Sequence, residues 1–201
     1  MTTASTELHS NFGPSGSKAW MACPGKIRAE RDCVDKPNDA ATEGSAAHEL
    51  AEQALRVHFE KNGDYWKWLK SMKGHKFKDW ILDNGKPVEV DGAMIGHVRD
   101  YVEYCIEVSG DDYDAVIIEE RVHYTDWVPN GWGTADFIVI KGSHVDVIDF
   151  KYGKQVKVSA YKNPQAMLYS LGVLQELDWL HGFETFEAHI YQPRMGNIDV
   201  Y

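Results

Sequence analysis

The chain has 201 residues, of which 43% are hydrophobic and 26% are charged, and its formal net charge at pH 7 is −10. This composition is ordinary for a globular protein, and the length suits a single domain, residues 1–201, with a substantial core. The negative charge argues against a protein that coats nucleic acid through a positive field over its whole surface. It leaves open an enzyme that grips phosphates locally, because carboxylates that bind divalent cations add to the formal negative charge.

Sequence features that would mark a membrane span or secretion are missing. No run approaches the 18 or so apolar residues that a transmembrane helix requires. The N-terminal stretch lacks the basic, apolar-cored pattern of a signal peptide. Three cysteines at irregular spacing (Cys23, Cys33 and Cys105) are typical of reduced thiols, so a cytoplasmic location without membrane contact is expected.

The first strong helix pattern begins at Ser45. Residues 1–14 read as a loose leader, followed by a short helical segment and then by a loop over residues 35–44. The segment SAAHELAEQALRVHFE is rich in alanine, leucine and glutamate, which favour helices. Its apolar residues recur at helical spacing, and His48 lies beside that apolar stripe. The sequence therefore predicts an amphipathic helix that holds His48 at the edge of its buried face.

Residues 61–91 are polar and rich in tryptophan, and we interpret them as an insertion of helical character. A second long helix is predicted behind it, from Gly92 to Val108. Asp91 can cap the start of this helix, and Gly110 lies near its end.

The second half of the chain predicts four strands and one helix. The strand candidates, rich in β-branched and aromatic residues, are residues 113–122, 137–140, 145–150 and 186–194. Lys141–His144, with the sequence KGSH, has the length and composition of a hairpin loop between the second and third strands. Asn163 and Pro164 then open a helix that runs to about Leu177, with asparagine as N-cap and proline at the first helical position.

The hairpin places two acidic residues opposite one another. Its four-residue loop pairs Ile140 with Val145. The same register brings Asp136 directly opposite Asp149, at about 5 Å between Cβ atoms, where two like charges are destabilising. Lys151 projects from the same face as Asp149, two residues further along. The hairpin thus predicts two carboxylates and one ammonium group at a single place.

Two carboxylates held so closely need either a shared proton or a cation. Lys151 favours the ionised form of both, so a divalent cation is the preferred interpretation. Mg²⁺ or Mn²⁺ can activate water and neutralise charge on a phosphoryl oxygen, leaving Lys151 to orient the nucleophile or stabilise the transition state. The plainer alternative is that Asp136 and Asp149 end strands near solvent and that Lys151 is an ordinary ion-pair partner. Spacing alone does not decide between them.

The residues around the hairpin resemble the PD-(D/E)xK nuclease superfamily, through G-x-x-D from Gly133 to Asp136 and D-x-K from Asp149 to Lys151. Further motifs follow the order of its RecB-like branch. PSGSKAWMACPGK resembles the S-x-S…C-P opening, EGSAAHELAE the G-x-x-x-H helix, NPQAMLYSLG the Q-x-x-x-Y helix, and IYQPR the following strand. The resemblance spans residues 15–194 and is greatest to phage-encoded exonucleases.

The resemblance implies an α/β fold with the superfamily's αβββαβ core, a central mixed sheet flanked by helices, here with a helical insertion. The implied metal ligands are His48, Asp136, Asp149 and the main-chain carbonyl of Phe150. Glu119 or Glu120, on the first core strand, would contact a second metal.

The same resemblance assigns catalytic roles. Lys151 would be the catalytic lysine, acting together with Asp136 and Asp149. Gln165 and Tyr169 are four residues apart and hence on one helix face, where they would orient the lysine or the substrate end. Taken singly, a histidine or tyrosine beside an apolar face is more often simple packing.

Some RecB-like nucleases hold an iron–sulfur cluster with four cysteines, one upstream and three downstream of the core. This chain has three cysteines and none after Cys105, so it cannot supply four thiolates. A zinc site from Cys23, Cys33 and a histidine lacks paired ligand spacing. Neither cofactor is expected at these cysteines, and Mg²⁺ or Mn²⁺ is the expected metal.

Two groups of residues are candidates for contacts with DNA. Residues 61–80 hold six lysines against two aspartates, interleaved with aromatic residues. The candidates there are Trp66 and Trp68, which could stack on bases, and Lys70 and Lys73, which could track phosphates. The alternative is a solvated arm whose tryptophans pack on the core. Lys154, Lys157 and Lys162 follow the catalytic strand and are better placed near the cut, which predicts an affinity that falls steeply with salt.

The sequence therefore predicts a metal-dependent deoxyribonuclease, an exonuclease that acts on linear DNA or single-stranded ends in phage recombination or DNA processing. The resemblance further implies a single-strand annealing protein as recombination partner, assembly into a homo-oligomer, and the host cytoplasm as location. Two alternatives stay open: a nuclease-fold protein that binds DNA without cutting it, and a metal hydrolase for another phosphoester.

Overall fold

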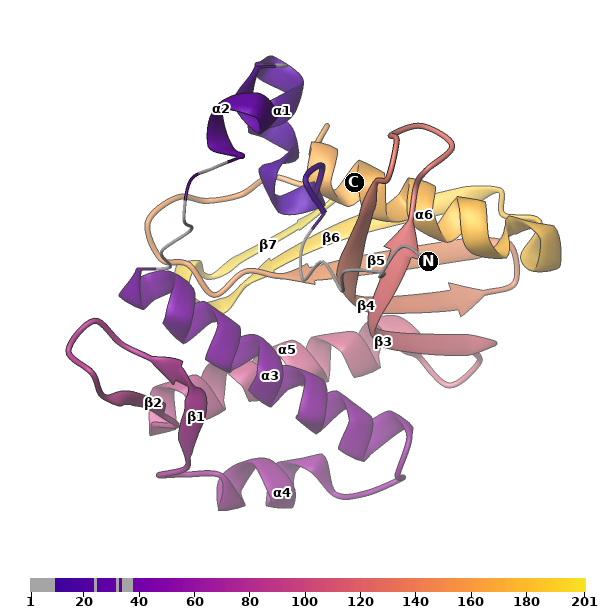
Figure 1. Ribbon diagram of the computed structural model, residues 1–201. Helices are drawn as coiled ribbons and strands as arrows, with labels where there is room; N and C mark the ends of the chain where they lie inside the picture. Colours follow the sequence, from indigo (N-terminus) through magenta and orange to yellow (C-terminus); the bar gives the residue numbers. More distant parts are fainter. Residues whose placement is uncertain (1–9, 24, 32, 34–37) are drawn as a thin grey trace, which may run out of the picture.

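The computed structural model describes residues 10–23, 25–31, 33 and 38–201. It is a mixed α/β structure around a five-stranded sheet in the order β3-β4-β5-β6-β7 (Figure 1). The strands are β3 (Ala115–His123), β4 (Trp132–Lys141), β5 (His144–Phe150), β6 (Thr185–Gln192) and β7 (Asn197–Val200). β5 and β6 run parallel, and the other neighbours are antiparallel. Among the described residues, no helix has the length and apolar character needed to cross a bilayer.

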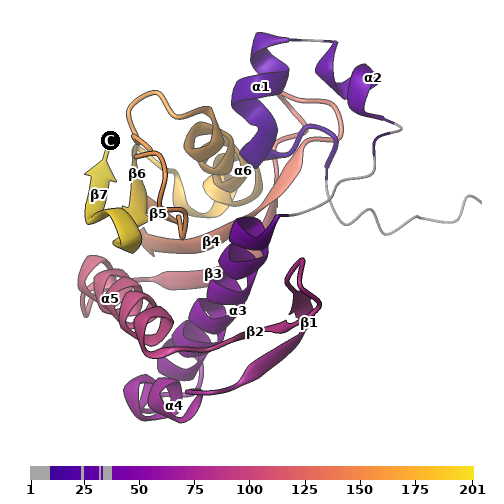
Figure 2. The same ribbon diagram turned by 90° about the vertical axis from the view of Figure 1, so that its left-hand side faces the viewer.

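Helices cover both faces of the sheet. They are α3 (Asp39–Phe59) and α5 (Gly92–Ser109) on one face and α6 (Pro164–His181) on the other (Figures 1 and 2). Because side chains alternate along a strand, β5 sends Val145 and Val147 toward α6, and Ile148 and Phe150 toward α3 and α5. Each face therefore has its own apolar core, and the strand between them is buried on both sides.

The helix that carries His48 begins earlier than the sequence predicted. Asn38 caps α3 by accepting a hydrogen bond from the Ala41 amide at 2.9 Å, and the helix starts at Asp39. The loop expected over residues 35–44 is therefore wrong from residue 39 onward, and residues 35–37 lie outside the described part of the chain. The asparagine cap followed by an acidic first turn is the local signal for this earlier start.

The N-terminal segment contributes short elements: a 3₁₀ turn η1 (Pro14–Gly16), α1 (Ser17–Ala22) and α2 (Lys26–Glu30). η1 and α1 pack on α6. Of the predicted loose leader, residues 1–9 lie outside the described residues.

The insertion at residues 61–91 is only partly helical, so that expectation is corrected. It consists of α4 (Tyr65–Ser71) and a two-stranded antiparallel sheet of β1 (Lys76–Ile81) and β2 (Pro87–Glu89). Leu69 and Phe77 are buried in the core that α3 and α5 share. In β1 the sequence KFKDWI alternates polar and apolar residues only over Lys76–Lys78, so it carries no clear strand period.

The remaining predicted elements are confirmed, with small changes at their ends. Asp91 caps α5 by accepting from the Met94 amide at 2.8 Å, and Asn163 caps α6 by accepting from the Gln165 amide at 3.0 Å. The hairpin register is confirmed from Ile140 opposite Val145 to Phe137 opposite Ile148, although Lys141 pairs with His144 and shortens the loop to two residues. The last predicted strand ends at Gln192, and a turn leads into β7, which was not predicted.

Candidate metal centre

β3 reverses its side-chain alternation in the middle of the strand. Ile118 packs in the core beneath α3 and α5, whereas Val122, four residues later, packs in the core beneath α6. A regular strand would turn these two residues to the same face. The reversal lies at Glu119, whose φ of 48° falls in the left-handed region that residues other than glycine rarely adopt. Glu119 therefore faces α3 instead of α6.

In β4 the side chains also switch faces of the sheet, at the position opposite the break in β3. Phe137 packs beneath α3 and α5, but Ala135, two residues earlier, packs beneath α6. The strand register pairs Ile118 with Phe137 and Glu120 with Ala135, so Glu119 and Asp136 are opposite each other at the break. The sheet thus loses its regular pleat at one place, and an acidic residue stands there on each strand.

His48 on α3 meets both of these acids. Its Nδ1 lies 3.3 Å from Asp136 Oδ1 and 3.8 Å from Glu119 Oε1. The ring stands 5.1 Å from the Phe150 ring, measured between centroids. The three donor atoms all lie within 4.8 Å of one another, close enough to hold one ion. The predicted contact between the His48 helix and Asp136 is therefore present.

The end of the β4–β5 ladder is closed by a side chain. Asp136 Oδ2 accepts a hydrogen bond from the Phe150 amide at 2.6 Å, just beyond the last main-chain pair of the hairpin. This bond fixes the Asp136 carboxylate between the two strands and leaves Oδ1 directed at His48. Phe150 thus contributes its amide and its ring to the centre, and a metal contact of its carbonyl stays a prediction.

Asp149 lies at the same end of the hairpin but contacts α6. Its Oδ2 is 2.8 Å from Lys151 Nζ, and its Oδ1 accepts from Gln165 Nε2 at 3.0 Å. Lys151 Nζ also donates to Gln165 Oε1 at 2.8 Å, and Gln165 Nε2 lies 3.3 Å from the Tyr169 hydroxyl. The four predicted residues Asp149, Lys151, Gln165 and Tyr169 therefore form one hydrogen-bonded network.

The charges of this centre are poorly balanced. Burial raises the pKa of Asp149, and the nearby Asp136 carboxylate adds to the rise while Lys151 opposes it. Burial likewise raises the pKa of Glu119 to about 7, against the opposing effect of His48. Three carboxylates thus share one imidazole and one ammonium group, and two of them are ionised with difficulty.

His48 and Asp136 form the best-matched pair. Burial by itself would lower the pKa of His48, but Asp136 and Glu119 raise it to about 10. Burial would raise the pKa of Asp136, but His48, Lys151 and the Phe150 amide lower it below its usual value. The imidazolium therefore occupies the position that a cation would take between the acids.

The donor set fits a divalent ion that prefers oxygen. Carboxylates from three strands and one imidazole converge here, which suits Mg²⁺ or Mn²⁺. A doubly charged ion among Glu119, Asp136 and Asp149 would offset the repulsion that raises their pKa values. His48, Glu119 and Asp136 already form a group, and Asp149 would reach it from the α6 side.

Of the two glutamates considered for a second metal, Glu119 is at the centre and Glu120 is exposed. Of the two alternatives, Glu119 is therefore the candidate ligand. Regular alternation from Ile118 would have turned Glu120 toward α3, and only the reversal at Glu119 changes the outcome. The adjacent pair of glutamates in a strand was the available signal, and it could not resolve which of them points inward.

Two clefts meet at Lys151. One, of about 1050 Å³, is lined by Lys157, Lys162 and Gln165, and by Lys18 on α1, which the sequence did not single out. The other, of about 480 Å³, is lined by Lys154, Arg194 and Lys151 itself. The three lysines predicted near the cut therefore line the two clefts that Lys151 also lines.

The tryptophans of the insertion pack away from the acidic centre. Trp66 and Trp68 pack against the core of α3 and α5, as the alternative interpretation predicted. Lys70 Nζ lies 5.1 Å from the Trp66 ring centroid, so one face of that ring is covered, and Lys73 is exposed. α4 lies at the opposite end of the molecule from α6 (Figures 1 and 2).

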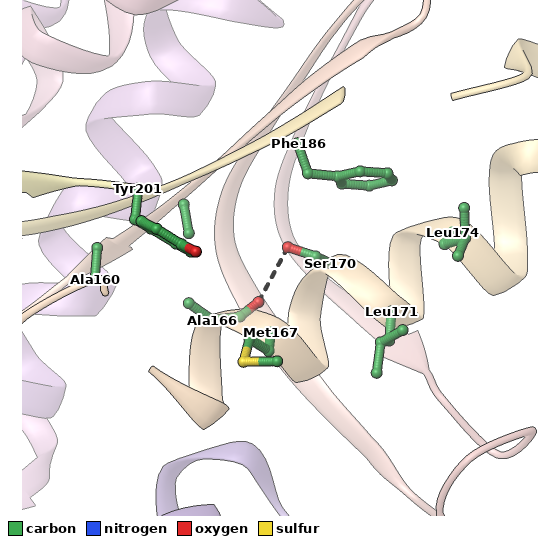
Figure 3. A pocket seen from close by; sticks show the side chains of 9 residues that line it. Ala160, Ala166, Met167, Ser170, Leu171, Leu174, Phe186 and Tyr201 are labelled. Carbon is green, nitrogen blue, oxygen red and sulfur yellow. Dashed lines mark hydrogen bonds between the residues drawn. The ribbon is translucent and has the colours of Figure 1, made fainter. Parts of the chain in front are cut away.

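A further cleft, of about 450 Å³, lies between α6 and the last strands and is lined by apolar groups (Figure 3). Met167, Leu171, Phe186 and Tyr201 contribute to it, and the Ser170 hydroxyl turns back to the Ala166 carbonyl at 3.1 Å. Its lining holds no charged side chain, so it has no part in the acidic centre.

Residues 9–201 match a family model with the description "Protein of unknown function (DUF2800)". The match covers nearly the whole chain, including every residue of the acidic centre. The description names no activity, and function must be inferred from the geometry of the centre.

Proposed function

We propose that this chain, which belongs to the DUF2800 family, is a metal-dependent deoxyribonuclease with a PD-(D/E)xK-type core. The observation that carries the proposal is the meeting of His48 and Asp136 with the Asp149–Lys151–Gln165 network at the end of the β4–β5 hairpin. These residues come from two strands and from helices on opposite faces of the sheet. A purely structural ion-pair network would not need so many uncompensated acids at one place.

The arrangement of elements supports the finer fold assignment. A hairpin, β4–β5, carries the two aspartates and the lysine, and a helix, α6, leads from it to the parallel neighbour β6. A helix from the N-terminal part, α3, supplies the histidine to the same end of the sheet. This is the αβββαβ order that the motifs implied, extended by the edge strand β7.

A divalent ion bound by the acids and His48 would supply an activated water and neutralise charge on a phosphoryl oxygen. Lys151 is held in place by Asp149 and Gln165, so its ammonium group is oriented before substrate binds. An ammonium group at that position stabilises the negative charge that develops on the phosphate oxygens. Tyr169 steadies Gln165 from the next turn of α6.

The surroundings of Lys151 favour a nucleic-acid substrate. Lys18, Lys157 and Lys162 line one of the two clefts that meet at Lys151. Lys154 and Arg194 line the other, together with Asp39 and with Glu43, which pairs with Arg194. Cations along two adjoining clefts suit a polymer with a phosphate at every unit. An isolated small phosphoester would need only one of these clefts.

The first test is degradation of end-labelled linear DNA with Mg²⁺ or Mn²⁺ by the wild type, Asp149→Ala and Lys151→Ala. We expect degradation by the wild type and by neither of these two variants. Asp79→Asn, which changes an exposed aspartate on β1, is the control and should retain full activity. Equal activity in all four proteins, or none in the wild type on any DNA, would rule out the proposal. Metal-dependent stabilisation without turnover would instead favour a DNA-binding protein that does not cut.

The exonuclease mode is tested separately with closed circular DNA of the same sequence. Sparing of the circle and loss of the linear form would establish that the enzyme needs an end. Equal cutting of both forms would retain the nuclease and replace the exonuclease by an endonuclease.

A further inference from the structure

A second group of metal-binding side chains lies at the other end of β5. His144 and Asp146 share one face of β5, and Glu187 and His189 share the same face of β6. The parallel register pairs His144 with Thr185 and Asp146 with Glu187. The face is the one that α5 covers, because the Tyr104 hydroxyl on α5 lies 2.7 Å from His189 Nδ1.

Two imidazoles converge on one oxygen of this group. His144 Nε2 lies 3.1 Å, and His189 Nε2 3.0 Å, from Asp146 Oδ1. Donor atoms of His144, Asp146 and Glu187 all lie within 4.8 Å of one another. In a tetrahedral zinc site with arms of about 2.0–2.1 Å, two ligand atoms are about 3.3 Å apart. The His144–Asp146 spacing is already close to that value, and Glu187, half of whose side chain is exposed, can close the remainder.

The second ring nitrogen of His144 also has a hydrogen-bond partner. Thr185 Oγ1 lies 2.7 Å from His144 Nδ1, and a hydroxyl can either donate to that nitrogen or accept from it. His144 can therefore change tautomer and present a free lone pair on Nε2 without losing its partner. Metal-binding imidazoles are usually held through their second nitrogen in this way.

The buried carboxylate is oriented as a one-oxygen ligand. The Asp146 side chain is 2% exposed, and its Oδ2 forms an ion pair with Lys141 Nζ at 2.8 Å. Lys141 Nζ donates a hydrogen bond to the Val108 carbonyl at 3.0 Å. Lys141 is thereby anchored on the far side, and Oδ1 is left facing His144 and His189. An oxygen with two lone pairs can accept from His189 Nε2 and bind an ion at the same time.

We propose that His144, Asp146 and Glu187 bind a zinc-class divalent ion, with water as the fourth ligand. His189 and Tyr104 are positioning residues that act through Asp146. An imidazole, two carboxylates and partial exposure fit Zn²⁺ better than the all-oxygen shell that Mg²⁺ prefers.

This second site is separate from the acidic centre. Asp146 and Asp149 are three residues apart on β5, a distance of about 10 Å along the strand, and they face opposite sides of the sheet. The ion would join β5 to β6 at the start of both strands, and would thus brace the strand that carries Asp149 and Lys151. Its presence does not depend on nuclease activity.

The test measures zinc binding to metal-depleted protein by calorimetry, in a His48→Ala background that disables the acidic centre. We expect one equivalent of Zn²⁺ per chain. Adding His144→Ala or Glu187→Gln should weaken binding at least 100-fold, and adding Tyr104→Phe should weaken it about 10- to 100-fold. Adding His75→Ala, which alters an exposed histidine outside both groups, should change nothing.

A second measurement replaces zinc with Co²⁺, whose visible absorption reports four-coordinate geometry with a nitrogen ligand. The absorption should appear in the His48→Ala protein and vanish when His144→Ala is added, with the circular dichroism of both unchanged. Absence of zinc binding in His48→Ala would overturn the proposal. Undiminished binding after loss of both His144 and Glu187 would overturn it equally.

Discussion

The pKa of a buried carboxylate is shifted in opposite directions at the two ends of β5. At the end of the strand, Asp149 lies near two other acids, and burial together with Asp136 raises its pKa. At the start of the strand, burial would raise the pKa of Asp146, but hydrogen bonds from His189, Lys141 and His144 lower it to about 2. Both carboxylates are almost fully buried, so burial does not distinguish them.

The difference lies in the number of partners for each charge. Among the residues that the structure describes, Asp146 has three partners that can carry positive charge and shares them only with Glu187. Asp149, Asp136 and Glu119 have two such partners among the three of them. A balanced group stabilises the fold even when no metal is bound, whereas an unbalanced one stores repulsion in the metal-free protein. Substitutions at the two ends should therefore have different effects.

The largest expected effect is on catalysis at the unbalanced end. Asp149→Asn should lower DNA hydrolysis by about 1000-fold or more, because it removes a proposed metal ligand and the carboxylate that orients Lys151. Asp146→Asn, the same substitution at the other end, should leave the rate within about tenfold at a temperature where the protein is folded. Initial rates on linear DNA at saturating Mn²⁺ measure both. Similar losses in the two variants would mean that the ends are not functionally distinct.

The largest effect on stability should occur at the balanced end. Asp146→Asn leaves Lys141 without its buried partner, and removing one member of such a pair costs about 3 kcal/mol of unfolding free energy. Because Lys141 is partly exposed, we expect the loss of unfolding free energy to be somewhat smaller than that figure. Urea denaturation in the presence of a chelator measures the change. A variant as stable as the wild type would show that the network contributes little.

An intermediate effect is expected from the hydrogen bonds that hold Lys151. Gln165→Ala removes the amide that joins Lys151 to Asp149, and hydrolysis should fall about 10- to 100-fold through misplacement of the ammonium group. Tyr169→Phe removes only the hydroxyl that contacts Gln165 and should cost less. The ratio of the two rates tests whether Tyr169 acts on Lys151 through Gln165. A larger loss from Tyr169→Phe than from Gln165→Ala would contradict that arrangement.

The pH dependence of the metal-free protein should reveal the His48 charge. The folded-state pKa of His48 is about 10, above its usual 6.5, so its contribution is fully present below pH 6.5 and is lost as the pH rises through 10. In a chelator, the melting temperature of the wild type should fall more steeply over that range than that of His48→Gln. His75→Gln should follow the wild type. Parallel curves for wild type and His48→Gln would contradict the charge assigned to His48.

The smallest expected effect is the change in stability of the metal-free protein on Asp149→Asn, and its sign should be opposite to that of Asp146→Asn. Because the raised pKa of Asp149 means that its ionisation destabilises the fold near neutral pH, Asp149→Asn should stabilise the metal-free protein. The loss of an acceptor for Lys151 reduces this gain, so about 1 kcal/mol or less is expected. Denaturation in chelator, run beside Asp146→Asn, gives the comparison. Destabilisation by both substitutions would remove the contrast between balanced and unbalanced ends.

Local sequence signals determined much of the β4–β5 hairpin. A strand period of two and a short loop containing Gly142 fixed the register that brings Asp136 and Asp149 to one end of the ladder. The caps at Asp91 and Asn163 marked the starts of two helices, because a side chain that satisfies the first free amides of a helix acts within a few residues.

Only the tertiary structure decided which acid joins His48 and which strands meet beyond the hairpin. The reversal at Glu119 depends on packing against α3 and α6 together, so no local pattern distinguishes Glu119 from Glu120. The parallel pairing of β5 with β6 brings His144 and Asp146 beside Glu187, more than forty residues along the chain. Pairing at that separation is set by how α6 returns the chain to the sheet, and the sequence of either strand alone carries no record of it.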